Sequence, residues 1–136
     1  MVTVEDTPVG RLGLSICYDM RFPALYEALG NRRCDALAVP AAFTVPTGEA
    51  HWETLLRARA IETGCWILAP AQAGLHDDGR RTWGRSTVVG PWGEVVAKLD
   101  HDQPGVLFAT LDFDAVTRAR NAVPQLTHDR DFAGPQ

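Results

Sequence analysis

One cysteine stands where the sequence predicts that a strand ends and a helix begins. Cys17 closes residues 10–17, in which aliphatic residues alternate with small or polar ones, as in a strand. Pro23, six residues on, suits the first position of a helix. A thiol held at such a junction lies near backbone N–H groups and the positive end of a helix dipole, which favour the nucleophilic thiolate. Cys17 is therefore a candidate nucleophile, placed like the reactive side chain of a nucleophile elbow. The alternative is a small buried hydrophobic residue.

Other chemistry is less well supported by the residue types and their spacing. His51 opens a predicted helix after a strand-end loop, so a Cys17–His51 dyad is a second hypothesis. The four histidines are scattered without the spacing of metal ligands, and we expect neither a metal nor a cofactor. The glycines of residues 10–13 precede a strand rather than a helix, unlike a dinucleotide-binding loop. We expect most of the following arginines to be solvated: Arg57, Arg59, Arg80, Arg81 and Arg85.

The composition is that of a globular domain. Of 136 residues, 46% are apolar and 22% are charged, and the formal net charge is −4. This charge argues against a nucleic-acid partner. No apolar run reaches the length of a membrane span, and no export signal is visible at residues 1–6. Three cysteines without close spacing predict reduced thiols, and hence a cytoplasmic protein.

The order of elements predicts a mixed α/β fold with helices packed on a sheet. Residues 40–50 contain two prolines and a glycine and are expected to form a loop. We predict helices at residues 23–30, 51–63 and 112–122. Strands are predicted at residues 2–4, 10–17, 35–39, 65–71, 85–89, 94–99 and 106–111, with a hairpin turn at 76–80.

Five stretches in the same order resemble the Nit-type amidases of the carbon–nitrogen hydrolase (nitrilase) superfamily. Together they extend over nearly the whole chain. The stretches are GLSICYDMRFP at 13–23, PAAF at 40–43, HWETLLRARAIE at 51–62, WGRSTVV at 83–89 and PWGEVVA at 91–97.

The resemblance implies roles for particular residues. Cys17 would attack an amide or nitrile carbon, ammonia would leave, and water would hydrolyse the thioester. The backbone N–H of Tyr18 matches the oxyanion donor, a contribution worth about 10²–10³ in rate. Ala41, Ala42 and Phe43 match positions that line the substrate pocket. The implied substrate is a small amide, such as an ω-amide of an α-keto acid or a deaminated-glutathione-like compound.

The chain departs from the family in its catalytic base. Members use a glutamate base and a lysine that both precede the cysteine, whereas residues 1–16 contain no lysine, and Glu5 and Asp6 match neither position. Lys98 is the only lysine in the sequence and matches no catalytic position. We therefore expect residues 1–136 to be the C-terminal part of a single carbon–nitrogen hydrolase domain, with an incomplete α-β-β-α sandwich whose N-terminal half is absent.

Two further expectations follow from this resemblance. An incomplete sandwich should leave exposed apolar surface and an unpaired sheet edge, so the chain should be weakly stable, self-associating or both. The family resemblance also implies a homodimer or a higher homo-oligomer. A catalytically inactive relative or fragment remains the alternative to an active enzyme.

Overall fold

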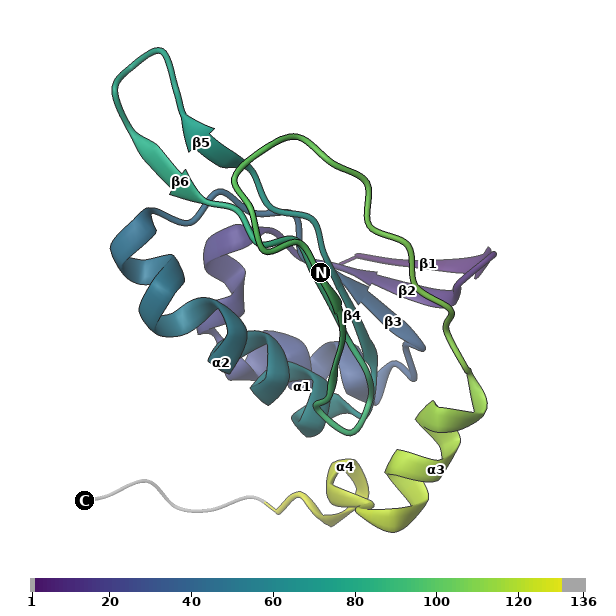
Figure 1. Ribbon diagram of the computed structural model, residues 1–136. Helices are drawn as coiled ribbons and strands as arrows, with labels where there is room; N and C mark the ends of the chain where they lie inside the picture. Colours follow the sequence, from purple (N-terminus) through teal and green to yellow (C-terminus); the bar gives the residue numbers. More distant parts are fainter. Residues whose placement is uncertain (1, 131–136) are drawn as a thin grey trace, which may run out of the picture.

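A six-stranded mixed sheet forms the centre of the molecule (Figure 1), as seen in a computed structural model that describes residues 2–130. Two parallel pairings join β2 to β3 and β3 to β4, while β1, β7 and β8 pair with their neighbours in antiparallel fashion. In spatial order the strands are β1 (Val2–Thr7), β2 (Gly10–Leu14), β3 (Ala36–Ala38), β4 (Trp66–Ala69), β7 (Thr87–Val89) and β8 (Val95–Lys98). β5 (Ala73–Leu75) and β6 (Arg81–Trp83) form a separate hairpin that projects beyond the sheet.

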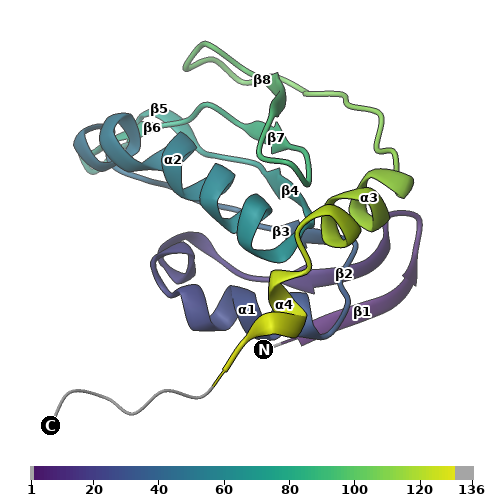
Figure 2. The same cartoon turned by 90° about the horizontal axis from the view of Figure 1, so that it is seen from below.

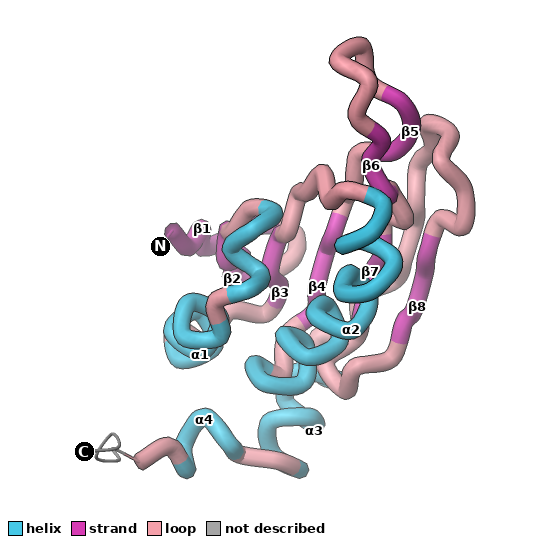
Figure 3. Tube along the Cα trace, turned by 90° about the vertical axis from the view of Figure 1, so that its left-hand side faces the viewer, coloured by secondary structure: helices cyan, strands magenta, loops and turns pink. Residues whose placement is uncertain are grey.

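Two helices cover one face of this sheet, as Figure 3 shows from the helical side. α1 (Pro23–Asn31) begins at Pro23 as predicted, because a proline in the first turn has no N–H to leave unpaired. α2 (Val45–Thr63) ends at Gly64, which adopts φ +60° in the left-handed region that favours glycine. The other helices are the 3₁₀ helix η1 (Cys17–Arg21), α3 (Asp114–Ala122) and α4 (Gln125–His128), and Figure 2 shows α4 beside α1.

The main core lies between the sheet and the two covering helices. Gly13 of β2 faces this core, and a side chain there would collide with Leu37. Leu56 and Trp52 of α2 and Leu29 of α1 are fully buried against the sheet. The close packing of β2 against β3 and α1 at Gly13 therefore depends on the missing Cβ.

The other face of the sheet is only partly covered. Trp66 is buried there under Val116 of α3, and the Trp66 indole N–H donates to the carbonyl of Asp112 at 3.1 Å. Side chains on this face are more exposed near β1, where Leu14 is 38% exposed and Val4 is 41% exposed. Residues 2–130 therefore contain one helical layer and one sheet, which are two of the four layers of the expected sandwich. The predicted α/β class is confirmed.

Parts of the structure differ from the prediction. The strand predicted at residues 10–17 ends at Leu14, and the 3₁₀ helix η1 begins at Cys17. α2 begins at Val45 rather than at residue 51, because Pro46 lies in the first turn of the helix, where proline is tolerated, and does not mark a loop. Residues 106–111 form no strand, because no strand within residues 2–130 pairs with them to form ladder hydrogen bonds. The segment after Gln125 begins with a short helix, α4, which the sequence pattern did not indicate.

Candidate active site

Cys17 occupies a sharp turn just beyond β2. Its φ of +46° lies in the left-handed region, which non-glycine residues seldom adopt. The Cys17 N–H donates to the carbonyl of Pro40 at 2.9 Å, which extends the β2–β3 pairing up to the turn. The Cys17 side chain packs against the main core yet is partly exposed. The chain therefore turns away from the sheet at Cys17, where the residue is partly exposed.

Ser15, two residues before Cys17, is hydrogen-bonded to both β3 and α1. The Ser15 hydroxyl donates to the carbonyl of Ala38 at 2.9 Å and is hydrogen-bonded to the Tyr26 hydroxyl at 2.7 Å. Burial raises the pKa of Tyr26, so its hydroxyl stays protonated at neutral pH. These bonds connect the end of β2 to β3 and α1, and they hold the backbone that positions Cys17.

The turn after Cys17 leaves one backbone N–H unused. The Asp19 N–H donates to the carbonyl of Ile16 at 2.9 Å, and the Ile16 N–H donates to Asp19 Oδ2 at 2.9 Å. The N–H of Tyr18 lies between these bonds in sequence and has no acceptor among residues 2–130. The first N–H groups of a helix lack intrahelical acceptors, so this donor is available to a ligand.

Residues 41–43 are held beside the next strand end. The Ala41 N–H donates to the carbonyl of Pro70 at 3.0 Å, and the Gln72 N–H donates to the carbonyl of Ala41 at 2.9 Å. Ala41 and Phe43 are buried, whereas Ala42 is exposed. Because β2, β3 and β4 are parallel, their carboxyl ends meet at one edge, and the structure brings Cys17 and residues 41–43 to that edge.

Arg21 contacts side chains from η1, from residues 41–43 and from α2 at this edge. Its guanidinium carbon lies 5.5 Å from the centroid of the Tyr18 ring and 5.2 Å from that of the Phe43 ring. Its Nη1 and Nη2 atoms lie 3.3 and 3.4 Å from Nδ1 of His51. Arg21 belongs to residues 13–23, which resemble the family, but its stacking between two aromatic rings could not be predicted from the sequence.

His51 is not paired with Cys17. The His51 ring is exposed, and its Nδ1 accepts from Arg21. Within residues 2–130 no hydrogen bond connects His51 to Cys17. The geometry of a Cys–His dyad is therefore not formed here.

Of the five arginines, Arg57, Arg80 and Arg81 are exposed, as expected for most of the set, and Arg59 is the exception. Only 4% of Arg59 is exposed, and its Nε–H donates to the carbonyl of Met20 in η1 at 3.0 Å. Its Nη1 forms an ion pair of 2.6 Å with Glu62. Arg59 thus ties α2 to the helix that carries Cys17. The side chain of Arg85 is also partly buried, against the Trp83 ring.

The remaining cysteines and the single lysine are engaged elsewhere. Cys34 and Cys65 are fully buried; burial raises the pKa of Cys34 to about 11 and also raises the pKa of Cys65. Lys98 Nζ lies 3.0 Å from Glu53 Oε2, and this partner raises the pKa of Lys98. Of the three cysteines, Cys17 is the one that is partly exposed.

Neither Cys17 nor residues 41–43 line any of five cavities found among residues 2–130. Over the described part of the chain, no group of three or more His, Cys, Asp or Glu side chains is placed to hold a metal ion. None of the helices within residues 2–130 has the length and apolar character needed to cross a membrane.

Known proteins resemble the chain along most of its length. Residues 2–121 match the family model described as carbon-nitrogen hydrolase. The deaminated glutathione amidase of Yersinia enterocolitica is 50% identical over 129 residues, which are 95% of this chain and 45% of that relative. The crystal structure of the Caenorhabditis elegans NitFhit protein superposes with a TM-score of 0.89 at 48% identity, over 96% of this chain and 32% of that chain.

An amidase of Nesterenkonia sp. AN1 has a TM-score of 0.71 at 29% identity, over 92% of this chain and 48% of its own. The chain thus spans less than half the length of each of these three relatives. Because the family model matches most of residues 1–136, the chain belongs to the carbon–nitrogen hydrolase family.

Proposed function

We propose that the chain carries the nucleophile and the oxyanion donor of an amidase that hydrolyses a small amide through a thioester on Cys17. The observation that carries the proposal is the left-handed turn at Cys17, which presents a partly exposed thiol beside the unused N–H of Tyr18. The similar structure of the Nesterenkonia amidase is described as showing acrylamide added at the active site cysteine.

In the proposed reaction the Cys17 thiolate forms a C–S bond to the amide carbon. The carbonyl oxygen becomes an oxyanion, which accepts a hydrogen bond from the Tyr18 N–H. The C–N bond then breaks, the leaving nitrogen takes a proton, and ammonia departs. Water attacks the thioester, releases the carboxylic acid and restores the thiol. A preorganised N–H donor of this kind contributes about 10²–10³ in rate.

Arg21 is the charged group best placed to orient a substrate. Its guanidinium lies over the Tyr18 and Phe43 rings at the edge where Cys17 is presented. A planar guanidinium pairs well with a carboxylate, so a substrate with a carboxylate remote from its amide suits this edge. We propose that Ala41, Ala42 and Phe43 line the pocket for the substrate, which is an ω-amide of an α-keto acid or a deaminated-glutathione-like compound. The amidase relatives support this class of substrate.

The base that activates Cys17 and the incoming water is proposed to come from the glutamate and lysine positions of the family, which residues 1–136 do not match. Residues 1–136 then act as the C-terminal part of a single carbon–nitrogen hydrolase domain. The 45% coverage of the Yersinia relative agrees with this proposal. The chain by itself should therefore turn over an amide much more slowly than a complete member. An inactive relative or fragment is the second candidate, favoured by the same missing groups.

The proposal is tested by measuring ammonia release from the amide of an α-keto dicarboxylic acid. The purified 136-residue chain, its Cys17→Ser variant and the Yersinia relative are assayed at equal concentration. We expect slow release by the chain and none above background by the variant. Equal release by the chain and by Cys17→Ser would refute a role for this thiol. Turnover comparable to the relative would show that the missing glutamate and lysine are not needed.

We further propose a homo-oligomer, a dimer or higher, in the reducing cytoplasm. All three cysteines are free thiols, which suits a reducing compartment. Val106 and Phe108 are 74% and 86% exposed, and burying these side chains between copies would stabilise an assembly. Sedimentation velocity should show a dimer or a larger species, and Phe108→Ser should shift it towards monomer. A monomer at micromolar concentration would contradict the oligomer.

A further inference from the structure

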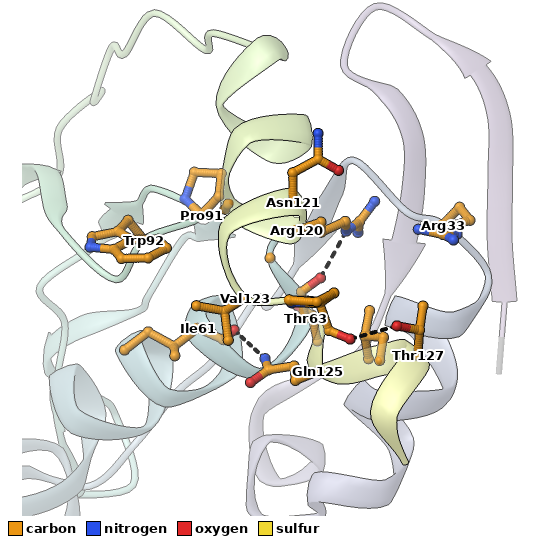
Figure 4. Close-up of a pocket in the computed structure, with 14 residues that line it drawn as sticks. Arg33, Ile61, Thr63, Pro91, Trp92, Arg120, Asn121, Val123, Gln125 and Thr127 are labelled. Carbon is orange, nitrogen blue, oxygen red and sulfur yellow. Dashed lines mark hydrogen bonds between the residues drawn. The ribbon is translucent and has the colours of Figure 1, made fainter.

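A cavity of about 360 Å³ lies at the C-terminal end of α2, and Figure 4 shows residues that line it. His51, which contacts Arg21, and Thr63, which lines the cavity, are separated by about 18 Å along the helix at 1.5 Å per residue. The end of α2, the turn at residues 91–92, α3 and α4 enclose this space. The cavity is therefore a separate site from the one proposed for amide hydrolysis.

The walls of the cavity are apolar and exposed. Trp92 is 61% exposed, Ile61 is 50% exposed and Val123 is 48% exposed, and all three line the same cavity with Leu126. These side chains come from the turn after β7, α2, the α3–α4 connection and α4, and Figure 4 labels Trp92, Ile61 and Val123 among them. Such a concave apolar surface with a few polar groups is typical of a small-molecule site.

The charged groups of the cavity all have the same sign. Arg33 and Arg120 line it, and none of its lining residues is an aspartate or a glutamate. Arg120 donates from Nε to the carbonyl of Thr63 at 3.1 Å and from Nη2 to the carbonyl of Cys34 at 2.6 Å. Its Nη1 has no acceptor among residues 2–130 and is not fully buried, so this end of the guanidinium is available.

The walls are held in place without a ligand. Arg120 binds the last carbonyl of α2, where a cation also favours the helix dipole. The Gln125 side-chain amide donates to the carbonyl of Ile61 at 2.6 Å and attaches α4 to α2. A preformed site loses less conformational entropy when it binds a ligand.

We propose that this cavity binds a small organic anion, with its carboxylate on Arg33 and Arg120 and its apolar body against Trp92, Ile61 and Val123. Two guanidiniums without a carboxylate partner in the lining supply the charge recognition. The apolar walls exclude water from one side of the ligand and favour an aromatic or aliphatic body over a bare inorganic anion. The site would function independently of catalysis at Cys17.

The test titrates the ¹⁵N-labelled chain with 4-phenylbutyrate and follows the tryptophan indole N–H signals by NMR. Its neutral analogue, 4-phenylbutan-1-ol, has the same apolar body without the charge. We expect a saturable shift of the Trp92 signal, with the alcohol binding at least about tenfold more weakly. The buried indoles of Trp52 and Trp66, which donate to the carbonyls of Arg85 and Asp112, are internal controls and should not move.

Two surface variants test the charge requirement without disturbing the core. Asn121→Asp adds a carboxylate of nearly equal size to the lining, and Arg33→Gln removes a guanidinium from it. Each variant should weaken binding of 4-phenylbutyrate about fivefold and leave the affinity for the alcohol unchanged. Arg32→Gln is the matched control, because Arg32 is exposed and does not line this cavity. Equal affinity for acid and alcohol, no saturable shift at Trp92, or equal effects at Arg32 and Arg33 would overturn the proposal.

Discussion

The three thiols of the chain should differ sharply in their reaction with iodoacetamide. Cys17 is partly exposed at the carboxyl edge of the sheet, whereas Cys34 and Cys65 are fully buried. The thiolate is the reacting form, so both access and ionisation decide the rate. We expect Cys17 to be alkylated first in the native chain and the other two to be protected.

The protection of Cys34 can be estimated from its ionisation. Burial raises the pKa of Cys34 to about 11 from an ordinary value of 9.0. At pH 8 about one Cys34 in a thousand is then a thiolate, against roughly one in ten in the unfolded chain, a difference of about a hundredfold. Because the sulfur is also inaccessible, a hundredfold slower alkylation than in the unfolded chain is the smallest effect expected.

The assay is a time course of alkylation at pH 8, followed by digestion and mass spectrometry of the three cysteine peptides. The same chain unfolded in urea gives the reference rate for each site. We expect Cys17 to react faster in the native chain than in urea, and Cys34 at least about a hundredfold slower. If native Cys34 reacts within tenfold of its unfolded rate, the argument from burial is wrong. If native Cys17 reacts no faster than in urea, the thiol is not activated and the inactive alternative is favoured.

Urea unfolding and thermal melting test three further predictions about the stability of the fold. The pKa of the Cys34 thiol is higher in the folded chain than in the unfolded chain, so its contribution to the free energy of unfolding is fully present below about pH 9. About 2–3 kcal/mol of this free energy should be lost by about pH 11. Cys34→Ala should make the fall with pH less steep, and an unchanged slope would refute the argument from burial. Gly48→Ala would gain about 1 kcal/mol of helix propensity, but its Cβ would collide with Trp83, so a net loss of about 1–3 kcal/mol is expected and a gain would contradict the packing. Arg59→Ala leaves the buried carbonyl of Met20 in η1 without its donor and should lower the free energy of unfolding by about 3 kcal/mol. Arg118→Ala removes an exposed ion pair of α3 and should lower it by less than about 0.5 kcal/mol. Equal losses would refute the role of Arg59 in joining α2 to η1.

Local signals in the sequence predicted much of the fold. Pro23 and Gly64 mark a helix start and a helix end because their backbone preferences act within one or two residues. The Asp78-Gly79 turn joins β5 to β6 as predicted, with Gly79 at φ +82°. In contrast, Pro46 was read as a loop residue, although the first turn of α2 accepts it.

Features that depend on distant residues could not be read from the sequence. The left-handed turn at Cys17 follows from its bond to Pro40 and from the anchoring of Ser15, which join segments about 23 residues apart. The burial of Arg59 depends on a carbonyl of η1, 39 residues away in sequence. The Arg33–Arg120 cavity likewise joins segments that no periodicity connects. Such contacts are set by the tertiary packing of the sheet and helices.

The central claim is that an oxyanion formed on Cys17 accepts a hydrogen bond from the Tyr18 N–H. A small aldehyde tests it directly, because a thiolate adds to the aldehyde carbon and turns the carbonyl oxygen into an alkoxide or hydroxyl at the same place. In ¹H–¹⁵N spectra of the labelled chain we predict that the Tyr18 amide signal shifts downfield as the adduct forms, and that Cys17→Ala abolishes the shift. An adduct on Cys17 that leaves the Tyr18 amide signal unmoved would contradict the account.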